Sequence, residues 1–255
     1  LIFPKKYVGG LFLFGLGVNL ALVGKSDLTE LAVSGLEYAP RAGKVLLSIA
    51  GMLTVLIEWV FPNRNKRKKN EFWVVLVAIL LGLQLMLMAS SWLMLYLSIE
   101  LVSISSYILT AFKFSKKSAE GALKYLIFGA FSSAVMLYGV SFLYGLSGTL
   151  EIAESLQSAW VAQSLLGGIA VVLALAGLLF KIAAVPLHVW SPDLYEAAPT
   201  AAVAFFSVAP KVAGVLVLHK IMQIAGLPQV MLPLLAVVSI ASILFGNLAA
   251  LRQKR

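Results

Sequence analysis

The sequence predicts an all-α, polytopic transmembrane helical bundle, and its composition, its segment lengths and the placement of its charges all favour this class. Of the 255 residues, 61% are hydrophobic and 12% are charged, and the mean hydropathy is +0.97. The apolar residues fall in long runs, most of them near the roughly 20 residues that an α-helix needs to cross a bilayer. We therefore expect about eight spans, with one broken helix near Lys181 and Pro186.

The expected spans are hydrophobic segments separated by polar connections. They are Val8–Gly24, Lys44–Pro62, Phe72–Ala89, Trp92–Phe112, Ala122–Leu146, Ser164–Tyr195, Thr200–Met222 and Gln229–Leu251. The segment Ser164–Tyr195 is too long for one straight helix and contains Pro186 and Pro192. Pro186 lacks a backbone donor and would clash with the carbonyl of Ile182. We therefore expect two half-helices that meet near Lys181.

The polar connections differ in charge along the chain. The strongly basic ones are Lys5-Lys6, Asn63–Lys69, Lys113–Lys117 and Arg252–Arg255, whereas the connections between them are mixed or acidic. With eight spans, every strongly basic segment falls on one side of the membrane, and the positive-inside rule places both ends of the sequence in the cytoplasm. Membrane orientation thus explains the net charge of +9 better than nucleic-acid binding does.

Composition also limits the kinds of metal and cofactor site that this chain can hold. The sequence has no cysteine, which excludes disulfides, thiolate metal sites and cysteine-ligated iron–sulfur clusters in this chain. Its two histidines lie far apart in sequence, which argues against a histidine-built haem or metal site. Because both ends adjoin apolar runs, at Leu1 and Arg255, we expect the sequence to be a fragment of a longer chain.

Three ionisable residues, Glu100, Lys181 and Lys211, lie well inside apolar segments. A charge at mid-bilayer costs about 3 kcal/mol on insertion scales, so such a residue is expected to have a function and a partner. Burial disfavours the charged forms and pairing favours them, so the three groups form coupled titrations that respond when one charge moves. This is what a proton carrier requires, and the alternative is that Glu100 and Lys181 form a static buried pair. His188, which follows the break, could relay a proton or lie at the membrane interface.

Helical spacing gives each of these charges a face. On the span that carries Glu100, one polar stripe contains Tyr96, Glu100, Ser103 and Tyr107. Behind Lys181, a stripe of small residues would let a neighbouring helix approach closely. Its members are Gly167, Ala170, Ala174 and Gly177. Around Lys211 the same spacing selects Ser207 and Gly214.

Two motifs resemble the antiporter-like membrane subunits of respiratory complex I, the NADH-quinone oxidoreductase. The first runs from Phe180 to Thr200 and continues to Lys211, and the second is Leu95–Tyr107. Within that family, the stretch Ser191–Thr200 is more similar to the N-type subunits than to the L- and M-type subunits. The resemblance covers essentially the whole sequence.

The resemblance implies that Glu100 pairs with Lys181 and that Lys211 is the next lysine along a hydrophilic axis. The implied activity is proton translocation coupled to electron transfer from NADH to quinone, with His188 as a candidate relay. The chain itself would carry no cofactor and no redox chemistry. NADH, FMN, iron–sulfur clusters and quinone are expected in partner subunits. The implied partners are M-type antiporter-like and small K- and J-type subunits in a bacterial inner membrane.

The resemblance also divides the chain into three parts. Residues 1–71 would hold N-terminal transmembrane helices and a basic cytoplasmic loop, residues 72–222 a five-helix antiporter-like repeat, and residues 223–255 the first helix of a truncated second repeat. Two alternative functions stay open. One is a subunit of a multi-subunit cation/proton antiporter, and the other is a structural scaffold subunit whose charges hold helices in register.

Overall fold

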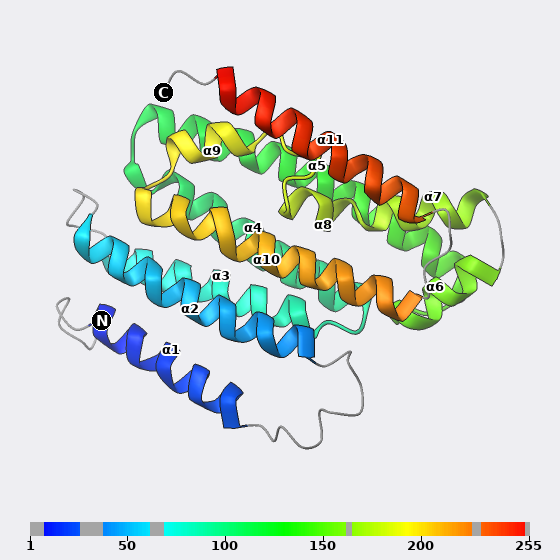
Figure 1. The fold of residues 1–255 in the computed structure, drawn as a ribbon, viewed down its shortest axis with the longest axis horizontal. Coiled ribbons are helices and arrows are strands. Elements are labelled where there is room, and N and C mark those ends of the chain that lie inside the picture. Colours follow the sequence, from blue (N-terminus) through cyan, green and yellow to red (C-terminus); the bar gives the residue numbers. More distant parts are fainter. Residues whose placement is uncertain (1–7, 26–37, 62–68, 162–164, 226–230, 253–255) are drawn as a thin grey trace.

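The computed structural model describes residues 8–25, 38–61, 69–161, 165–225 and 231–252, and these form a bundle of helices lying side by side (Figure 1). The α-helices are α1 Val8–Lys25, α2 Tyr38–Val60, α3 Lys69–Met88, α4 Trp92–Thr110, α5 Lys116–Ser147, α6 Ile152–Val161, α7 Leu165–Ala174, α8 Ala176–Lys181, α9 Ser191–Ala197, α10 Thr200–Ala225 and α11 Met231–Arg252, with a short 3-10 helix, η3 Ala111–Lys113. Within the described residues, six of them (α2 to α5, α10 and α11) are long and apolar enough to cross a membrane. The predicted all-α, polytopic membrane bundle is therefore confirmed.

Helix α5 is longer than the sequence predicted, because it begins at Lys116 rather than at Ala122. The start is fixed by a capping box. The Ser118 N–H donates to Ser115 Oγ at 3.1 Å, and the Ser115 N–H donates to Ser118 Oγ at 3.0 Å. These two bonds satisfy amides that would otherwise be unpaired at the helix start, so the helix extends into the basic connection.

The connection that follows α5 was predicted as an acidic loop, and it contains the helix α6 instead. This helix buries one face, which is made of Ile152, Leu156 and Ala159. The spacing of four and three residues is that of an amphipathic helix. The indole Nε1 of Trp92 donates to Ser155 Oγ at 2.8 Å, which ties α6 to the start of α4.

The helix ends that flank the basic connections lie at one end of the bundle, on the left of Figure 1. These are the end of α2, the start of α3, the end of α4, the start of α5 and the end of α11. Lys113–Lys117 lies there, whereas Lys5-Lys6, residues 63–68 and residues 253–255 lie outside the described residues. The arrangement agrees with the prediction that the basic segments share one side.

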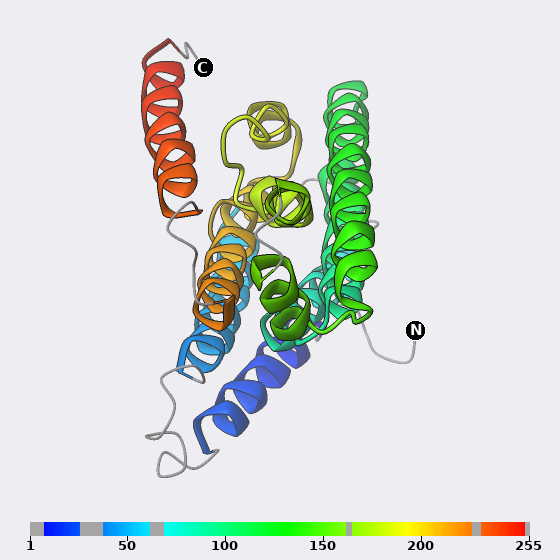
Figure 2. The same ribbon diagram turned by 90° about the vertical axis from the view of Figure 1, so that its right-hand side faces the viewer.

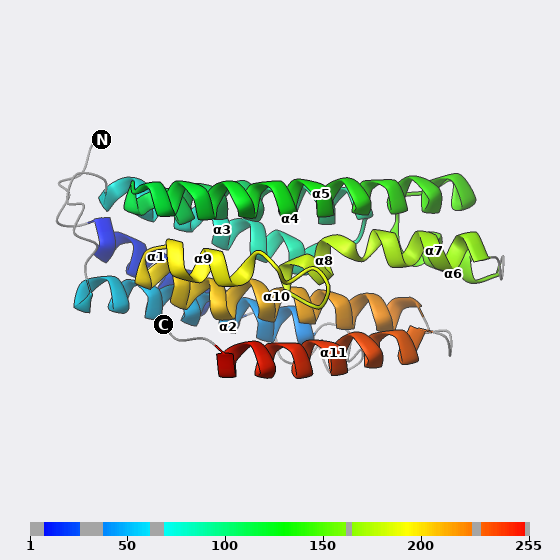
Figure 3. The ribbon, with the colours of Figure 1, turned by 90° about the horizontal axis from the view of Figure 1, so that it is seen from above.

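The segment that carries Lys181 is broken, as predicted. Helices α7 and α8 form one bent rod that ends at Lys181, the chain unwinds over residues 182–190, and α9 continues from Ser191. Figures 2 and 3 show that this broken segment lies between α5 on one side and α11 on the other. The unwound stretch is thus enclosed by helices on two sides.

The small-residue stripe behind Lys181 packs against α5. A Cβ atom added to Gly139 of α5 would lie 2.2 Å from the backbone nitrogen of Ala174 and 2.7 Å from the carbonyl oxygen of Ala170. A Cβ atom on Gly177 would lie 2.4 Å from the sulfur of Met136. The backbones of the two helices are therefore in close contact, which is the packing that the sequence predicted.

Candidate functional site

Helix α8 ends in a capping motif that lies just before Pro186. Ala183 adopts a left-handed conformation with φ 57°. Its N–H donates to the carbonyl of Phe180 at 3.0 Å, and the N–H of Ala184 donates to the carbonyl of Leu179 at 2.9 Å. This is the hydrogen-bond pattern of a Schellman motif. The break therefore lies where it was predicted, and a capping motif that was not predicted satisfies the last turn of the helix.

Lys181 occupies the last turn of α8, and its side chain is 1% exposed. Its Nζ lies 5.8 Å from the ring centre of Tyr125 and 6.0 Å from that of Phe180, within the range of cation–π attraction. Within the described part of the chain, this Nζ has no hydrogen-bond partner. A buried ammonium without hydrogen bonds is costly, so its protonation depends strongly on the charges around it.

Glu100 of α4 is the acidic residue that interacts with Lys181. The carboxylate attracts the ammonium electrostatically, although no salt bridge joins them among the described residues. Instead, the hydroxyl of Ser133 on α5 donates to the carboxylate of Glu100. The two groups therefore attract each other without a direct ion pair, and Ser133 of a third helix holds the carboxylate.

Two members of the predicted polar stripe of α4, Glu100 and Tyr107, contact α5. Ser103 and Tyr107 are buried and hydrogen-bonded to each other. A Cβ atom on Gly129 of α5 would lie 1.8 Å from the Tyr107 hydroxyl, so the glycine makes room for that group. The Tyr107 ring also packs edge-on against Tyr125, with 4.7 Å between ring centres. Tyr107, on the same stripe as Glu100, therefore contacts one of the aromatic residues beside Lys181.

A stack of aromatic residues beside Lys181 was not predicted from the sequence. Tyr125 of α5 stacks on Trp190 with 4.4 Å between ring centres, and on Phe180 at 5.8 Å. Trp190 belongs to the unwound stretch, where its indole N–H donates to the carbonyl of Leu187 at 2.9 Å. The stack covers the side of Lys181 that faces α5. Phe180 and Trp190 lie within the motif Phe180–Thr200, but no local signal marked their contact with Tyr125.

Lys211 of α10 is half-buried, and its Nζ lies 5.4 Å from the ring centre of Tyr195 on α9. The two residues predicted to share its face, Ser207 and Gly214, have different surroundings. Gly214 packs against the unwound stretch, where an added Cβ atom would lie 2.6 Å from Cγ2 of Ile182, whereas Ser207 is exposed. Lys211 therefore faces α9 and not a polar stripe of its own helix.

His188 lies in the unwound stretch beside α11. Its ring centre is 4.4 Å from that of Phe245, and its Nδ1 is buried without a hydrogen-bond partner among the described residues. A second contact fixes the same stretch, because the N–H of Val185 donates to Ser242 Oγ of α11 at 3.0 Å. The position suits either a relay or an interfacial role, so both predictions for His188 stay open.

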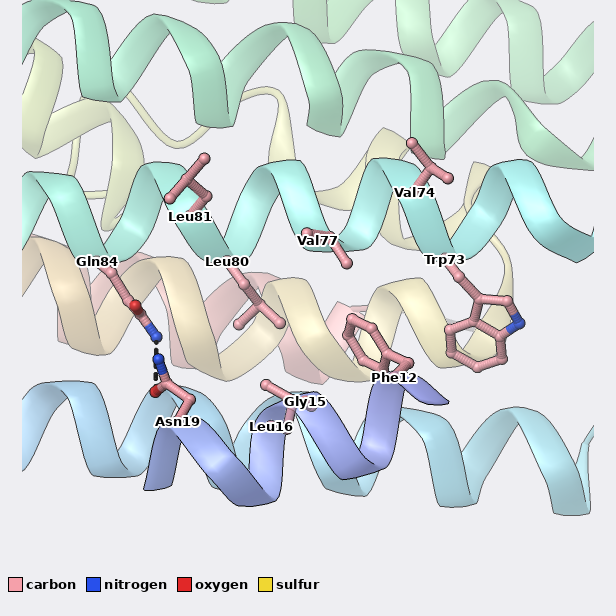
Figure 4. A pocket seen from close by; sticks show the side chains of 10 residues that line it. All are labelled: Phe12, Gly15, Leu16, Asn19, Trp73, Val74, Val77, Leu80, Leu81 and Gln84. Carbon is pink, nitrogen blue, oxygen red and sulfur yellow. Dashed lines mark hydrogen bonds between the residues drawn. The ribbon is translucent and has the colours of Figure 1, made fainter. Parts of the chain in front are cut away.

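A separate pocket of about 460 Å³ lies between α1 and α3 (Figure 4). Apolar side chains line it, and its polar part is a hydrogen bond of 3.2 Å from Gln84 Nε2 to Asn19 Oδ1. It contains no charged side chain, so it offers nothing to proton transfer. Nowhere in the described ranges do three His, Asp or Glu side chains gather in a way that could hold a metal ion.

The broken helix and its charges lie in the part of the chain that matches a known family. The family model described as NADH:quinone oxidoreductase/Mrp antiporter, TM, matches residues 89–255. The chain belongs to this family. The match includes Glu100, Lys181, His188 and Lys211, so every candidate site residue lies within the family segment.

Relatives within this family include subunits of NADH-quinone oxidoreductases. The chain is 35% identical over 257 residues to NADH-quinone oxidoreductase subunit N of Rhodospirillum rubrum, covering 96% of this chain and 53% of the relative. It is 42% identical to subunit N 1 of Rhizobium meliloti, over 82% of this chain and 45% of the relative. A chain of respiratory complex I from Thermus thermophilus, solved with bound aureothin, superposes with a TM-score of 0.79 at 29% identity, over 99% of this chain and 55% of that chain. The chain thus spans about half the length of these relatives.

Proposed function

We propose that this chain acts in a proton-translocating membrane subunit of an NADH-quinone oxidoreductase. One observation carries the proposal. Lys181 is buried at the end of a broken helix, without a hydrogen bond among the described residues, and a carboxylate on another helix attracts it. Relatives at 35% and 42% identity are named as subunits of such an enzyme, which supports this reaction over other kinds of proton transport.

The mechanism follows from the balance of charges around Lys181. Attraction to Glu100 and to the Tyr125 ring stabilises the ammonium, while burial opposes it. If Glu100 is neutralised or its attraction is weakened, the ammonium loses part of its support and releases a proton. Lys211, which lies beside the Tyr195 ring, is the next group that can take the proton when its amine is neutral.

The proposal assigns the redox chemistry to partner subunits. NADH, FMN, iron–sulfur clusters and quinone would be bound there, and quinone reduction would supply the energy that resets Glu100 and Lys181. The expected neighbours are M-type antiporter-like and small K- and J-type subunits. The expected location is the inner membrane of a bacterium, with both ends of this sequence in the cytoplasm.

A native gel of mildly solubilised membranes, stained for NADH dehydrogenase activity and probed for this chain, tests the assignment. Co-migration with a large active band is expected. Migration in a smaller band without NADH activity would favour the cation/proton antiporter, a candidate because the family description includes the Mrp antiporter.

Replacing Lys181 by Met then tests the mechanism. Met keeps an unbranched apolar stem without the charge, so the assembled complex is expected to lose proton pumping. Lys116→Met, at an exposed lysine at the start of α5, is the matched control and should pump normally. Normal pumping by an assembled Lys181→Met complex would support a structural scaffold and contradict the proposal.

A further inference from the structure

The tyrosines of the site differ in what their hydroxyl groups do. Tyr107 is hydrogen-bonded to Ser103, and Tyr125 is hydrogen-bonded to Ser106. The hydroxyl oxygen of Tyr195 is also buried, but it has no hydrogen-bond partner in the described part of the chain. Buried polar groups are nearly always satisfied, so an unsatisfied one calls for a specific explanation.

Tyr195 lies beside one of the two lysines and interacts with the tyrosine that contacts the other. Its ring centre is 5.4 Å from Nζ of Lys211. It also interacts electrostatically with Tyr125, whose ring centre is 5.8 Å from Nζ of Lys181. Each lysine therefore contacts one tyrosine ring, and the free hydroxyl belongs to the tyrosine beside Lys211.

Helix α9 holds Tyr195 in this place. A Cβ atom on Gly121 of α5 would lie 2.5 Å from Cβ of Ala197, so the two helices touch closely near the end of α9. Asp193 accepts a hydrogen bond from Lys124 of α5 at 3.5 Å. The position of the hydroxyl is thus set by packing between α5 and α9 and not by a hydrogen bond of its own.

We propose that Tyr195 is a proton-relay residue between Lys181 and Lys211, an inference that rests on the proposed function. A phenol hydroxyl can accept and donate at the same oxygen. As the Lys181 ammonium gives up a proton, the Tyr195 oxygen accepts it, and the original O–H proton passes to the neutral amine of Lys211. One N–H bond and one O–H bond break, and one of each forms, so Tyr195 stays neutral while one positive charge moves between the lysines.

The flexible stems of the lysines make this transfer geometrically reasonable. Proton transfer needs heavy atoms within hydrogen-bond reach, and a lysine carries its amine on a mobile four-carbon stem. Lys211 is half-buried and already lies over the Tyr195 ring, so a rotation of its stem brings Nζ toward the hydroxyl. Rotation of the hydroxyl about its C–O bond then restores the starting state.

The test replaces Tyr195 by Phe in the full-length protein, assembled in its native complex in inverted membrane vesicles. Phe keeps the ring, its packing and its attraction for Lys211, and removes the hydroxyl alone. We expect proton pumping to slow by about tenfold or more, while the complex still assembles on a native gel. Tyr138→Phe is the matched control, since Tyr138 of α5 is 60% exposed, and it should leave pumping unchanged.

Tyr195→His separates a relay from a structural role. Imidazole exchanges protons near neutral pH, so His should recover part of the rate lost in the Phe variant and change the pH profile of pumping. Native pumping by Tyr195→Phe would overturn the inference. If the Phe variant fails to assemble, a Tyr195→His variant with the native pH profile would overturn it instead.

Lys181→Met in the same vesicles separates this inference from the proposed function. Loss of pumping in Lys181→Met with normal pumping in Tyr195→Phe would refute only the relay. Normal pumping in both variants would refute the proposed function as well.

Discussion

Replacing Gly139 by Ala tests the packing that holds the broken helix against α5. The added methyl group would lie 2.2 Å from the backbone nitrogen of Ala174 and 2.7 Å from the carbonyl oxygen of Ala170. Both obstacles are backbone atoms, which cannot rotate away as a side chain can. The helices α5 and α7 must therefore separate locally to admit the methyl group.

Two effects of opposite sign determine how much Gly139→Ala changes the stability of the protein. Inserting a methyl group into a well-packed contact costs about 1–3 kcal/mol, and replacing a helical glycine by alanine returns about 1 kcal/mol. Because the obstacles are rigid, the upper part of the overpacking range applies, and we expect a net destabilisation of about 2 kcal/mol. The separation would also shift α7 and α8 relative to Tyr125, so proton pumping should fall along with stability.

Gly145→Ala is the matched control for this substitution. Gly145 lies on the same helix, and an added Cβ atom would meet nothing within 4 Å. Only the helix propensity then changes, so this variant should gain about 1 kcal/mol. Thermal unfolding of the purified complex in detergent measures both variants side by side. A Gly139→Ala midpoint at or above that of Gly145→Ala would refute the close approach of the two helices.

Two further substitutions test individual groups. Glu100→Gln keeps the shape of the side chain but removes the charge that attracts Lys181. Proton pumping in membrane vesicles should therefore fall at least tenfold, as expected when an acid–base group is lost. Unchanged pumping would exclude Glu100 from the proton path. Lys220 donates to the carbonyls of Ala89 at 2.9 Å and Leu87 at 3.4 Å, at the end of α3. Lys220→Met should therefore lower stability by about 1–3 kcal/mol in thermal unfolding while NADH oxidation persists, and an unchanged midpoint would show that this cap contributes nothing.

The spans were predictable because the signals that mark them are local. A run of apolar residues long enough to cross a bilayer is visible in any window of the sequence, and so is a basic connection such as Lys113–Lys117. The same holds for the small-residue stripe, since helical periodicity alone places Ala170 and Ala174 on one face. What that face would meet, Gly139 of α5, depends on the tertiary structure and was not predictable.

The end of α8 combines a signal that was predicted with one that was not. Pro186 is a visible helix breaker, and it pointed to the right region. The helix nevertheless ends at a left-handed residue that is alanine, Ala183, where glycine is the usual occupant and the usual signal. Helix α6 is the opposite case, because its amphipathic spacing was present in the sequence and was overlooked.

Tyr125 and Tyr195 could not be recognised from sequence, because their importance comes from contacts between helices. Each is one of 8 tyrosines in the chain, and although Tyr195 lies within the motif Phe180–Thr200, its place in the sequence does not show which side chains it meets. Their places next to Lys181 and Lys211 arise from the packing of α5, α9 and α10. The charges themselves were visible, whereas the groups that modulate them were not.

The break also changes the electrostatic surroundings of Lys181. The carbonyl end of a helix carries a partial negative charge, which stabilises a nearby cation by about 0.3–1 kcal/mol at exposed sites and more when partly buried. Lys181 is in the last turn of α8, so this end acts on its ammonium together with the Tyr125 ring and Glu100. The break therefore adds the end of a helix to the attractions that oppose the burial of the Lys181 ammonium.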